Sequence, residues 1–120
     1  MQPKSFEMLW KHYVPRDGAP RNVQGTLLRA IAKISHEVSI NECANWGPEL
    51  EESVDALRRE LGAPDALPAA ERAAALADLD TVNAKARAGA HAELPPVIAR
   101  VKAVVVDWCN RRLAEQAREA

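Results

Sequence analysis

The chain has 120 residues, of which 48% are hydrophobic and 28% charged, and this composition is ordinary for one folded domain. Its 16 basic and 17 acidic side chains give a formal net charge of -1. This near balance excludes binding to nucleic acid or to an anionic membrane through an overall positive charge.

The beginning of the chain carries no sign of secretion or membrane insertion. The residues after Met1 read QPKSFEMLWKHY and lack the apolar run of a signal peptide. The apolar run at residues 103–106 is far too short to span a bilayer. The two cysteines, Cys43 and Cys109, form no CxxC pair. We therefore expect a cytoplasmic protein with both thiols reduced.

Residues 5–14 are predicted to form the first helix. Its apolar residues recur at helical spacing and are mostly aromatic: Phe6, Leu9, Trp10 and Tyr13. Pro15 ends this helix, and residues 15–20 have the composition of a turn.

The second helix is predicted over residues 22–40, with Asn22 as its N-cap. Its apolar stripe is Leu27, Ile31, Ile34 and Val38. Gly25 lies in the first turn, where it weakens the helix less than it would in the middle. A glycine there also allows another backbone to approach closely.

The third helix is predicted over residues 48–61, with Pro48 at its first position and an acidic first turn. Its apolar stripe is Leu50, Val54, Leu57 and Leu61. Gly62 is suited to the C′ position after this helix, and residues 62–68 form a linker.

The fourth helix is predicted over residues 69–88 and is rich in alanine, so its helical propensity is high. Its larger apolar residues are few: Leu76, Leu79 and Val82. Because it has little apolar surface to bury, we place it at the edge of the bundle, and Gly89 is expected to end it.

The last helix is predicted to begin after Pro95-Pro96. Residues 104–106 are three valines, which favour a strand. The segment nevertheless continues without a break for well over the ~10 residues that strands rarely exceed, and no other strand-like segment is present to pair with it. Trp108 and Cys109 are expected in or near the core.

The five segments predict an all-α protein, a single compact bundle of four to five helices over residues 1–120.

Metal and catalytic motifs are absent from the sequence. His36 and Cys43 would share a face only if the second helix continued, and no short ligand pair such as CxxC or HxxxH occurs. There is no GxSxG, P-loop or GxGxxG pattern, and neither cysteine follows a helix start or a basic cluster that would activate its thiol. We expect no metal, no cofactor and no catalytic residue, with His36 a surface residue.

Glu49 and Glu52 form an ExxE pair of the kind that MazG-type nucleotide pyrophosphohydrolases use to hold magnesium. The ExxD motif that completes such a site is missing. The acidic residues are also favoured simply because they lie near a helix N-terminus. A small Mg-dependent all-α nucleotide pyrophosphohydrolase therefore stays an alternative with an incomplete motif.

DNA recognition by a helix-turn-helix is not expected. Residues 41–47 are too long for its tight turn, and the helix that would read the DNA begins with acidic residues.

The segment of residues 41–47 holds Trp46 beside Asn45. Trp46 either plugs this corner of the bundle or, like Trp10 and Tyr13, serves as an anchor for a partner protein.

One further pattern consists of Trp10, Tyr13, Pro15, Gly18, Val23-Gln24-Gly25, Leu27-Leu28-Arg29-Ala30 and Asn45-Trp46, with a weaker part at Asp107-Trp108-Cys109-Asn110. This pattern resembles a family of small bacterial helical proteins, a family that brings no settled activity. Thr26 and Cys43-Ala44 depart from the family's pattern. The resemblance implies a bacterial helical protein and assigns no catalytic residue. Gln24 is placed to hydrogen-bond groups near the loop.

These observations favour a non-enzymatic cytoplasmic domain that binds another protein, such as an immunity or antitoxin-like protein that neutralises a toxin. The candidate partner-binding residues are Trp10, Tyr13, Arg29, Asn45 and Trp46. Neither nucleic acid nor a membrane is an expected partner. The protein is expected as a monomer or a homodimer, and a further alternative is a homo-oligomeric scaffold in which the apolar side of the last helix forms a dimer seam.

Overall fold

The computed structural model describes residues 3–40, 48–63 and 65–119, and every regular element in these ranges is helical. The elements are α1 (Phe6–Tyr13), α2 (Val23–Ile40), α3 (Pro48–Leu61), α4 (Ala69–Arg87), the short 3₁₀ helix η1 (His91–Glu93) and α5 (Leu94–Glu119). Within the described ranges there is no strand, so the valine run of the last segment is helical. The predicted all-α fold, a compact helical bundle, is confirmed.

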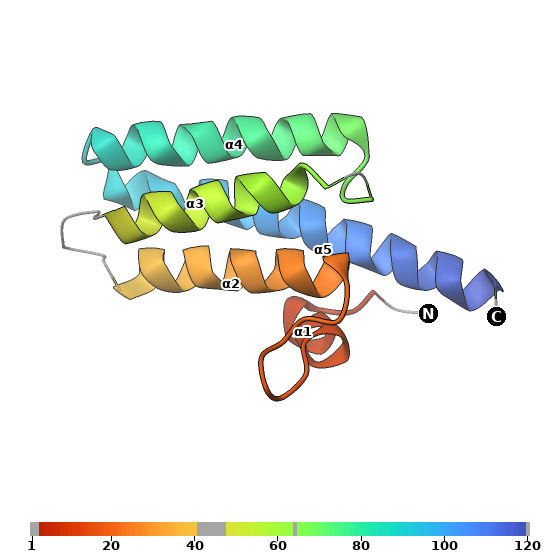
Figure 1. Ribbon diagram of the computed structural model, residues 1–120. Coiled ribbons are helices and arrows are strands. Elements are labelled where there is room, and N and C mark those ends of the chain that lie inside the picture. Colours follow the sequence, from red (N-terminus) through yellow and green to blue (C-terminus); the bar gives the residue numbers. More distant parts are fainter. Residues whose placement is uncertain (1–2, 41–47, 64, 120) are drawn as a thin grey trace.

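The four long helices form a closed ring (Figure 1). α2 packs on α3, α3 on α4 and α4 on α5, and α5 packs back on α2. This is the arrangement of a four-helix bundle. α4, which the sequence places at the edge, is thus one wall of the ring between α3 and α5. α1 lies outside the ring, where it contacts α2 and α5.

The core consists of the predicted apolar stripes. All eight stripe residues of α2 and α3 are buried: Leu27, Ile31, Ile34, Val38, Leu50, Val54, Leu57 and Leu61. On α5 the buried residues include Val101, Val105, Trp108 and Cys109, so the predicted core positions of the last two are confirmed. This apolar side of α5 packs against helices of the same chain, and the homo-oligomeric scaffold considered from the sequence stays a prediction.

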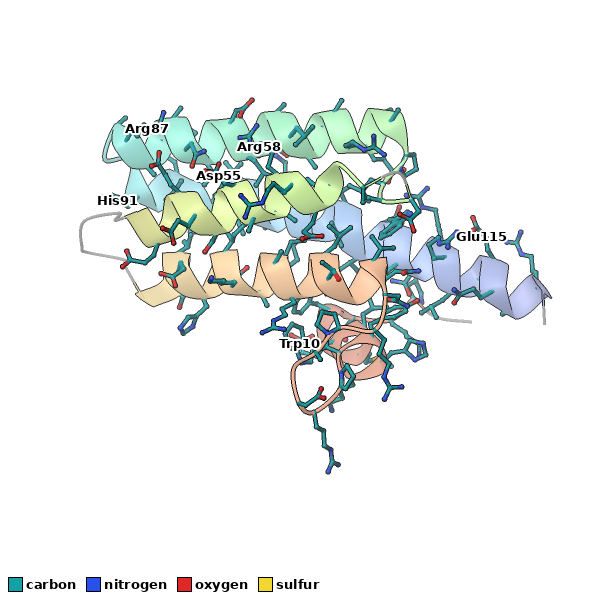
Figure 2. All side chains as sticks on the ribbon, in the orientation of Figure 1. Trp10, Asp55, Arg58, Arg87, His91 and Glu115 are labelled. Carbon is teal, nitrogen blue, oxygen red and sulfur yellow. The ribbon has the colours of Figure 1, made fainter. Side chains whose placement is uncertain are left out.

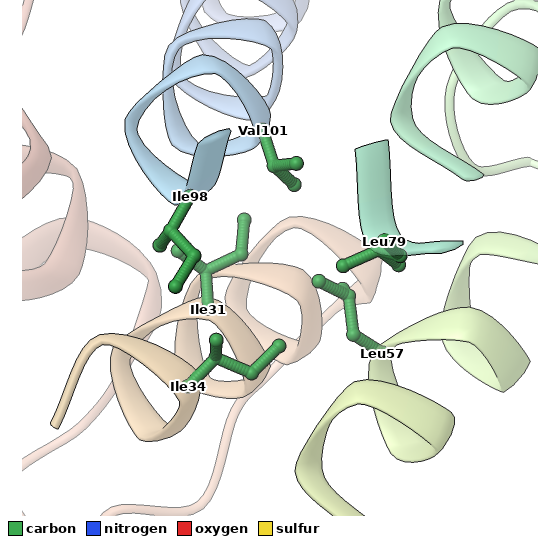
Figure 3. Close-up of a pocket in the computed structure, with 6 residues that line it drawn as sticks. All are labelled: Ile31, Ile34, Leu57, Leu79, Ile98 and Val101. Atoms are coloured by element: carbon green, nitrogen blue, oxygen red, sulfur yellow. The ribbon is translucent and has the colours of Figure 1, made fainter. Parts of the chain in front are cut away.

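A small void lies at the centre of the ring (Figure 3). It is lined by Ile31, Ile34, Leu57, Leu79, Ile98 and Val101, which come from all four helices. Its volume of about 10 Å³ is at the lower limit for one water molecule. The lining is entirely apolar and offers no polar group to which a water could hydrogen-bond.

Ion pairs flank α4 on both sides. Arg58 of α3 lies 2.6 Å from Asp80, and Arg100 of α5 lies 3.2 Å from Asp78. Near the end of α4, Arg87 pairs with Glu51 of α3; Figure 2 shows Arg87 and Arg58 on this side of the molecule. α4 itself buries only Ala75, Leu79 and Val82. Exposed ion pairs are worth at most about 1 kcal/mol each, so they fix the register of α4 more than they stabilise it.

The helix ends follow the predicted signals at two positions. Asn22 caps α2, since its Oδ1 accepts a hydrogen bond of 3.0 Å from the backbone N–H of Gly25. Gly89 ends α4 with φ at 77°, and the N–H of the next residue, Ala90, donates to the carbonyl of Lys85 at 2.9 Å. This is the Schellman motif, which requires a residue of positive φ.

Two other helix ends differ from the predictions. Gly62 follows α3 without a positive φ, and its N–H bonds the carbonyl of Arg59 at 3.0 Å in a tighter turn. α5 begins at Leu94, so Pro95 and Pro96 lie inside its first turn and not before it. The first-turn N–H groups of a helix have no partner within the helix, so proline costs little there.

Of the helices in the described ranges, none is long and apolar enough to cross a membrane.

The N-terminal segment is held against α5. The Asn110 side chain accepts a hydrogen bond from the N–H of Lys4 at 2.7 Å and donates one to the carbonyl of Lys4 at 3.0 Å. The ammonium of Lys102 lies 4.3 Å from the centre of the Phe6 ring, a cation–π contact. These contacts fix the beginning of α1 on the outside of the bundle.

Candidate functional site: the α1 surface and an arginine pocket

Trp10, the first predicted partner-binding residue, lies half-buried on α1. Its ring centre is 6.2 Å from that of Phe6, with the planes tilted by 35°. Both rings pack against the core, while part of each stays open to solvent. Figure 2 shows Trp10 where α1 meets the bundle. An aromatic side chain held in this way loses little conformational entropy when it binds a partner.

Tyr13, the second predicted residue, is buried and not on the surface. Its side chain is 4% exposed, and its hydroxyl makes no hydrogen bond within the described structure. The His12 ring contacts it edge-on, with the centres 4.7 Å apart. Burial, and next the nearby Cys109 thiol, raise the pKa of Tyr13. In this position Tyr13 can contact a partner only if α1 moves.

Arg29, the third predicted residue, is exposed on α2. Its guanidinium donates a hydrogen bond to the carbonyl of Gly18, in the connection between α1 and α2. Gly18 has φ at 80°, which glycine adopts readily. Arg29 thus anchors this connection while remaining accessible. Asn45 and Trp46 lie outside the described residues, and so does Cys43.

The outer side of α1 carries an apolar group that no prediction named. Met8 is 51% exposed, and no other large apolar side chain in the described ranges is exposed. Lys11 and His12 follow at three and four residues, so all three lie on one side of the helix. Trp10, two residues after Met8, lies on the other side of the helix and is half-buried. We define the α1 surface as Met8, Lys11, His12 and Trp10, four of the side chains by which α1 is open to solvent. The sequence contained a signal for this surface, because Met8 is an apolar residue that lies off the helix face shared by Leu9 and Tyr13.

A second feature is a pocket between the start of α4 and the C-terminal half of α5. Its apolar wall includes Leu67, Pro68 and Trp108, and Arg72, Arg111 and Arg112 supply three guanidinium groups. Glu115, which also lines it, is labelled in Figure 2 on the protruding part of α5. Leu67 is buried, so the predicted linker contributes to the core as well as to this pocket. We call this feature the arginine pocket.

The three arginines of the pocket differ in how their donors are used. Arg111 bonds the carboxylates of Glu71 and Asp107, and the bond to Glu71 is the main reason that its pKa is raised. Arg72 donates to the carbonyl of Leu67 at 3.0 Å. Arg112 has an ion pair of 3.6 Å with Glu115. The Nε atoms of Arg72 and Arg112 are buried and have no hydrogen-bond partner in the described structure.

Other candidate chemistry is less well supported. In the part of the chain that the structure describes, no three His, Cys, Asp or Glu side chains lie close enough to hold a metal ion. Glu49 and Glu52 lie at the start of α3, and Glu51 between them pairs with Arg87. Cys109 is buried, and burial raises the pKa of its thiol to about 12, so it stays protonated at neutral pH. His36 is exposed, as expected from the sequence.

Two expectations concern the neighbouring residues Gln24 and Gly25. Gln24 is 2% exposed, and its Nε2 has no hydrogen-bond partner in the described ranges. The loop near which its bonds are expected lies outside these ranges, so that expectation stays a prediction. Gly25 behaves as predicted, because a Cβ there would lie 2.8 Å from the carbonyl oxygen of Tyr13.

The arginine pocket was missed because its parts come from separate helices. The neighbouring Arg111 and Arg112 stand out in the sequence, but nothing local connects them to Arg72 or to the linker before α4.

Comparison with known proteins adds no family: no family model matches the chain, and no curated protein and no solved structure matches it significantly.

Proposed function

We propose that this protein is a non-enzymatic cytoplasmic binding protein that engages a partner protein through the α1 surface. The observation that carries this proposal is the exposure of Met8, together with the partial exposure of Trp10, on a helix fixed to the bundle. Met, Trp and Arg are enriched at the centres of protein interfaces. Arg29, which is exposed on α2 and bonds the carbonyl of Gly18 in the connection after α1, adds a charged donor for such a partner.

Rigidity supports a binding role for this surface. α1 contacts both α2 and α5, and the Lys4–Asn110 bonds fix the segment before it. A surface that is already ordered spends little free energy on ordering when it binds. Neutralising a toxin requires only tight binding and no reacting group. We therefore propose an immunity or antitoxin-like role, with a toxin as the partner.

The test begins with a pull-down from the native host with the full chain, followed by mass spectrometry to identify the partner. Binding of the purified partner is then measured by calorimetry for three variants: Met8→Glu, Trp10→Ala and Arg29→Ala. We expect Met8→Glu and Trp10→Ala each to weaken binding about tenfold or more, as substitution at an interface hot spot does. The same two variants should lose protection in cells that express the partner as a toxin.

The matched control is Ala77→Glu. Ala77 is exposed on α4, and α4 makes no contact with α1 in the described structure. This variant adds the same charge as Met8→Glu at a site away from the α1 surface and should bind as tightly as the wild type. The thermal melting temperature of each variant separates a binding defect from unfolding. Equal affinity for Met8→Glu, Trp10→Ala and the wild type would show that the α1 surface is not the interface.

A further inference from the structure

The arginine pocket has hydrogen-bond donors without acceptors. Each guanidinium carries five N–H donors and no acceptor. Arg111 is occupied by two carboxylates, whereas Arg72 has one bond to a backbone carbonyl and Arg112 has one long ion pair. The buried Nε–H groups of Arg72 and Arg112 are unmatched. These two Nε–H groups are covered by the protein's own atoms, so a ligand in the pocket meets the terminal N–H groups of Arg72 and Arg112. Those groups are only partly used, and acceptor oxygens of a ligand can complete their hydrogen bonds.

The charges that line the pocket limit the charge of such a ligand. Arg111 is already paired with Glu71 and Asp107, which leaves Arg72 and Arg112 beside the two carboxylates of Asp65 and Glu115. A ligand with one negative charge therefore meets less repulsion than a ligand with two. A phosphate group with a charge close to two would meet the repulsion of Asp65 and Glu115 as well as the attraction of the arginines.

The pocket wall also has an apolar part. Pro68 and Ala69 are exposed at the start of α4, and Leu67 and Trp108 lie beneath the surface next to them. A ligand with a hydrophobic group can bury it against these side chains while its charged end remains at the guanidinium groups.

We propose that the arginine pocket binds a carboxylate carried on an apolar group. Arg72 and Arg112 hold the carboxylate oxygens, and the wall of Pro68, Ala69 and Trp108 contacts the apolar part. A small organic acid and the C-terminal residue of a peptide offer this same chemistry. The pocket shares no residue with the α1 surface, so this inference does not depend on the proposed function.

The experiment is a titration of the full ¹⁵N-labelled chain, followed by NMR. The probes are 4-phenylbutyrate, the uncharged 4-phenylbutanol, and inorganic phosphate. We expect 4-phenylbutyrate to shift the Nε–H signals of Arg72 and Arg112 and the indole signal of Trp108 in a saturable way. The alcohol and phosphate should bind at least about tenfold more weakly. Equal binding of the alcohol, or tighter binding of phosphate, would overturn the proposal.

Variants locate the site. Arg112→Gln should weaken 4-phenylbutyrate binding about tenfold or more, as should Arg72→Gln. Ala69→Phe keeps all three arginines but fills the apolar side, so it should weaken binding even if Arg72→Gln disturbs the fold through its bond to Leu67. Arg118→Gln is the matched control, since Arg118 is exposed on α5 and does not line this pocket. Full affinity in both Arg112→Gln and Ala69→Phe would place the binding elsewhere and refute the assignment.

A second pair of probes distinguishes the two sources of the ligand. A pentapeptide that ends in leucine is tested with a free C-terminal carboxylate and with an amidated C-terminus. Tighter binding of the free peptide than of 4-phenylbutyrate identifies a chain terminus as the natural ligand class. Tighter binding of 4-phenylbutyrate identifies a small organic acid, and both results support a carboxylate site. Absence of binding by all of these probes would contradict it.

Discussion

Gly25 shows how one absent side chain determines where a helix can dock. A Cβ at this position would lie 2.8 Å from the carbonyl oxygen of Tyr13 and 3.0 Å from the Cβ of Pro20. The end of α1 and the connection after it can approach α2 this closely only because residue 25 is glycine. The close approach in turn accompanies the burial of the Tyr13 ring.

Gly25→Ala is therefore expected to destabilise the protein, although alanine is the better helix former by about 1 kcal/mol. The clash should exceed this gain and lower the free energy of unfolding by about 1–3 kcal/mol in a urea titration. Ser39→Ala is the control, because Ser39 is exposed in the same helix and gains propensity without a clash. A Gly25→Ala variant as stable as the Ser39→Ala variant would show that α1 shifts without cost.

Cys109 makes the stability depend on pH in the alkaline range. Its pKa is about 12 in the folded protein because burial disfavours the thiolate, against an ordinary value of 9.0. Below pH 9 the thiol is protonated in both states and has no effect. Between pH 9 and 12 only the unfolded state loses the proton, so the folded state becomes less stable as the pH rises. Tyr13, whose pKa is raised in the same direction, adds to this loss.

We expect the free energy of unfolding to fall from pH 9 upwards, with Cys109 contributing at most about 1.4 kcal/mol per pH unit. Urea titrations between pH 8 and 11 should show a smaller slope for Cys109→Ala in a Cys43→Ser background. In that background the remaining thiol should also react with iodoacetamide at pH 8 only as fast as the protein opens. Rapid alkylation of the folded protein would contradict the burial of Cys109.

At the scale of the elements, one side chain joins the N-terminal segment to α5. Asn110 offers its carbonyl oxygen to the N–H of Lys4 and its amide to the carbonyl of Lys4, at 2.7 and 3.0 Å. Its amide also donates to the carbonyl of Val106. An aspartate in its place would keep the acceptor but would put a second negative oxygen against two backbone carbonyls.

Asn110→Asp should release the segment before α1. We expect it to lower the free energy of unfolding by about 1–3 kcal/mol and to speed hydrogen exchange of the α1 amides. Gln116→Glu, the same change at an exposed position of α5, should alter stability by less than about 0.5 kcal/mol. Unchanged exchange in α1 for Asn110→Asp would mean that α1 is held by its apolar contacts alone.

The long helices could be predicted because each carries a regular apolar stripe together with a start or stop signal, as Asn22 and Gly89 show. What could not be predicted depends on the neighbours of each element. Tyr13 and Trp10 share one face of α1, and only the docked position of α1 shows that the first is buried and the second half-exposed. α4 has too few apolar residues to reveal its place in the ring, which its packing on α3 and α5 establishes. The arginine pocket likewise exists only after α4 and α5 have packed.

At the scale of the whole molecule, the four helices meet around the central void. Its lining residues come from all four helices of the ring, so a substitution at any one of them alters the packing between all four helices. A void of this kind also leaves its apolar lining without packing contacts on one side.

Val101→Ile adds one methylene group toward this void and should raise the free energy of unfolding by about 0.5–1 kcal/mol. Leu79→Ala enlarges the void and should lower it by about 2–5 kcal/mol. Val104→Ile serves as the control, because Val104 lies on the same helix but does not line the void. The three variants are compared by urea titration at neutral pH. A destabilised Val101→Ile variant would show that the void has no room for a further methylene group.

The bonds between Lys4 and Asn110 also have a consequence for biosynthesis. The two residues are 106 positions apart, so the segment that leaves the ribosome early has to wait for a helix that leaves it late. Until then the aromatic side of α1 lacks its α5 support, and α2, α3 and α4 present an open groove. A nascent chain therefore exposes apolar surface until α5 has been synthesised, and this is the stage at which we expect chaperones to bind it.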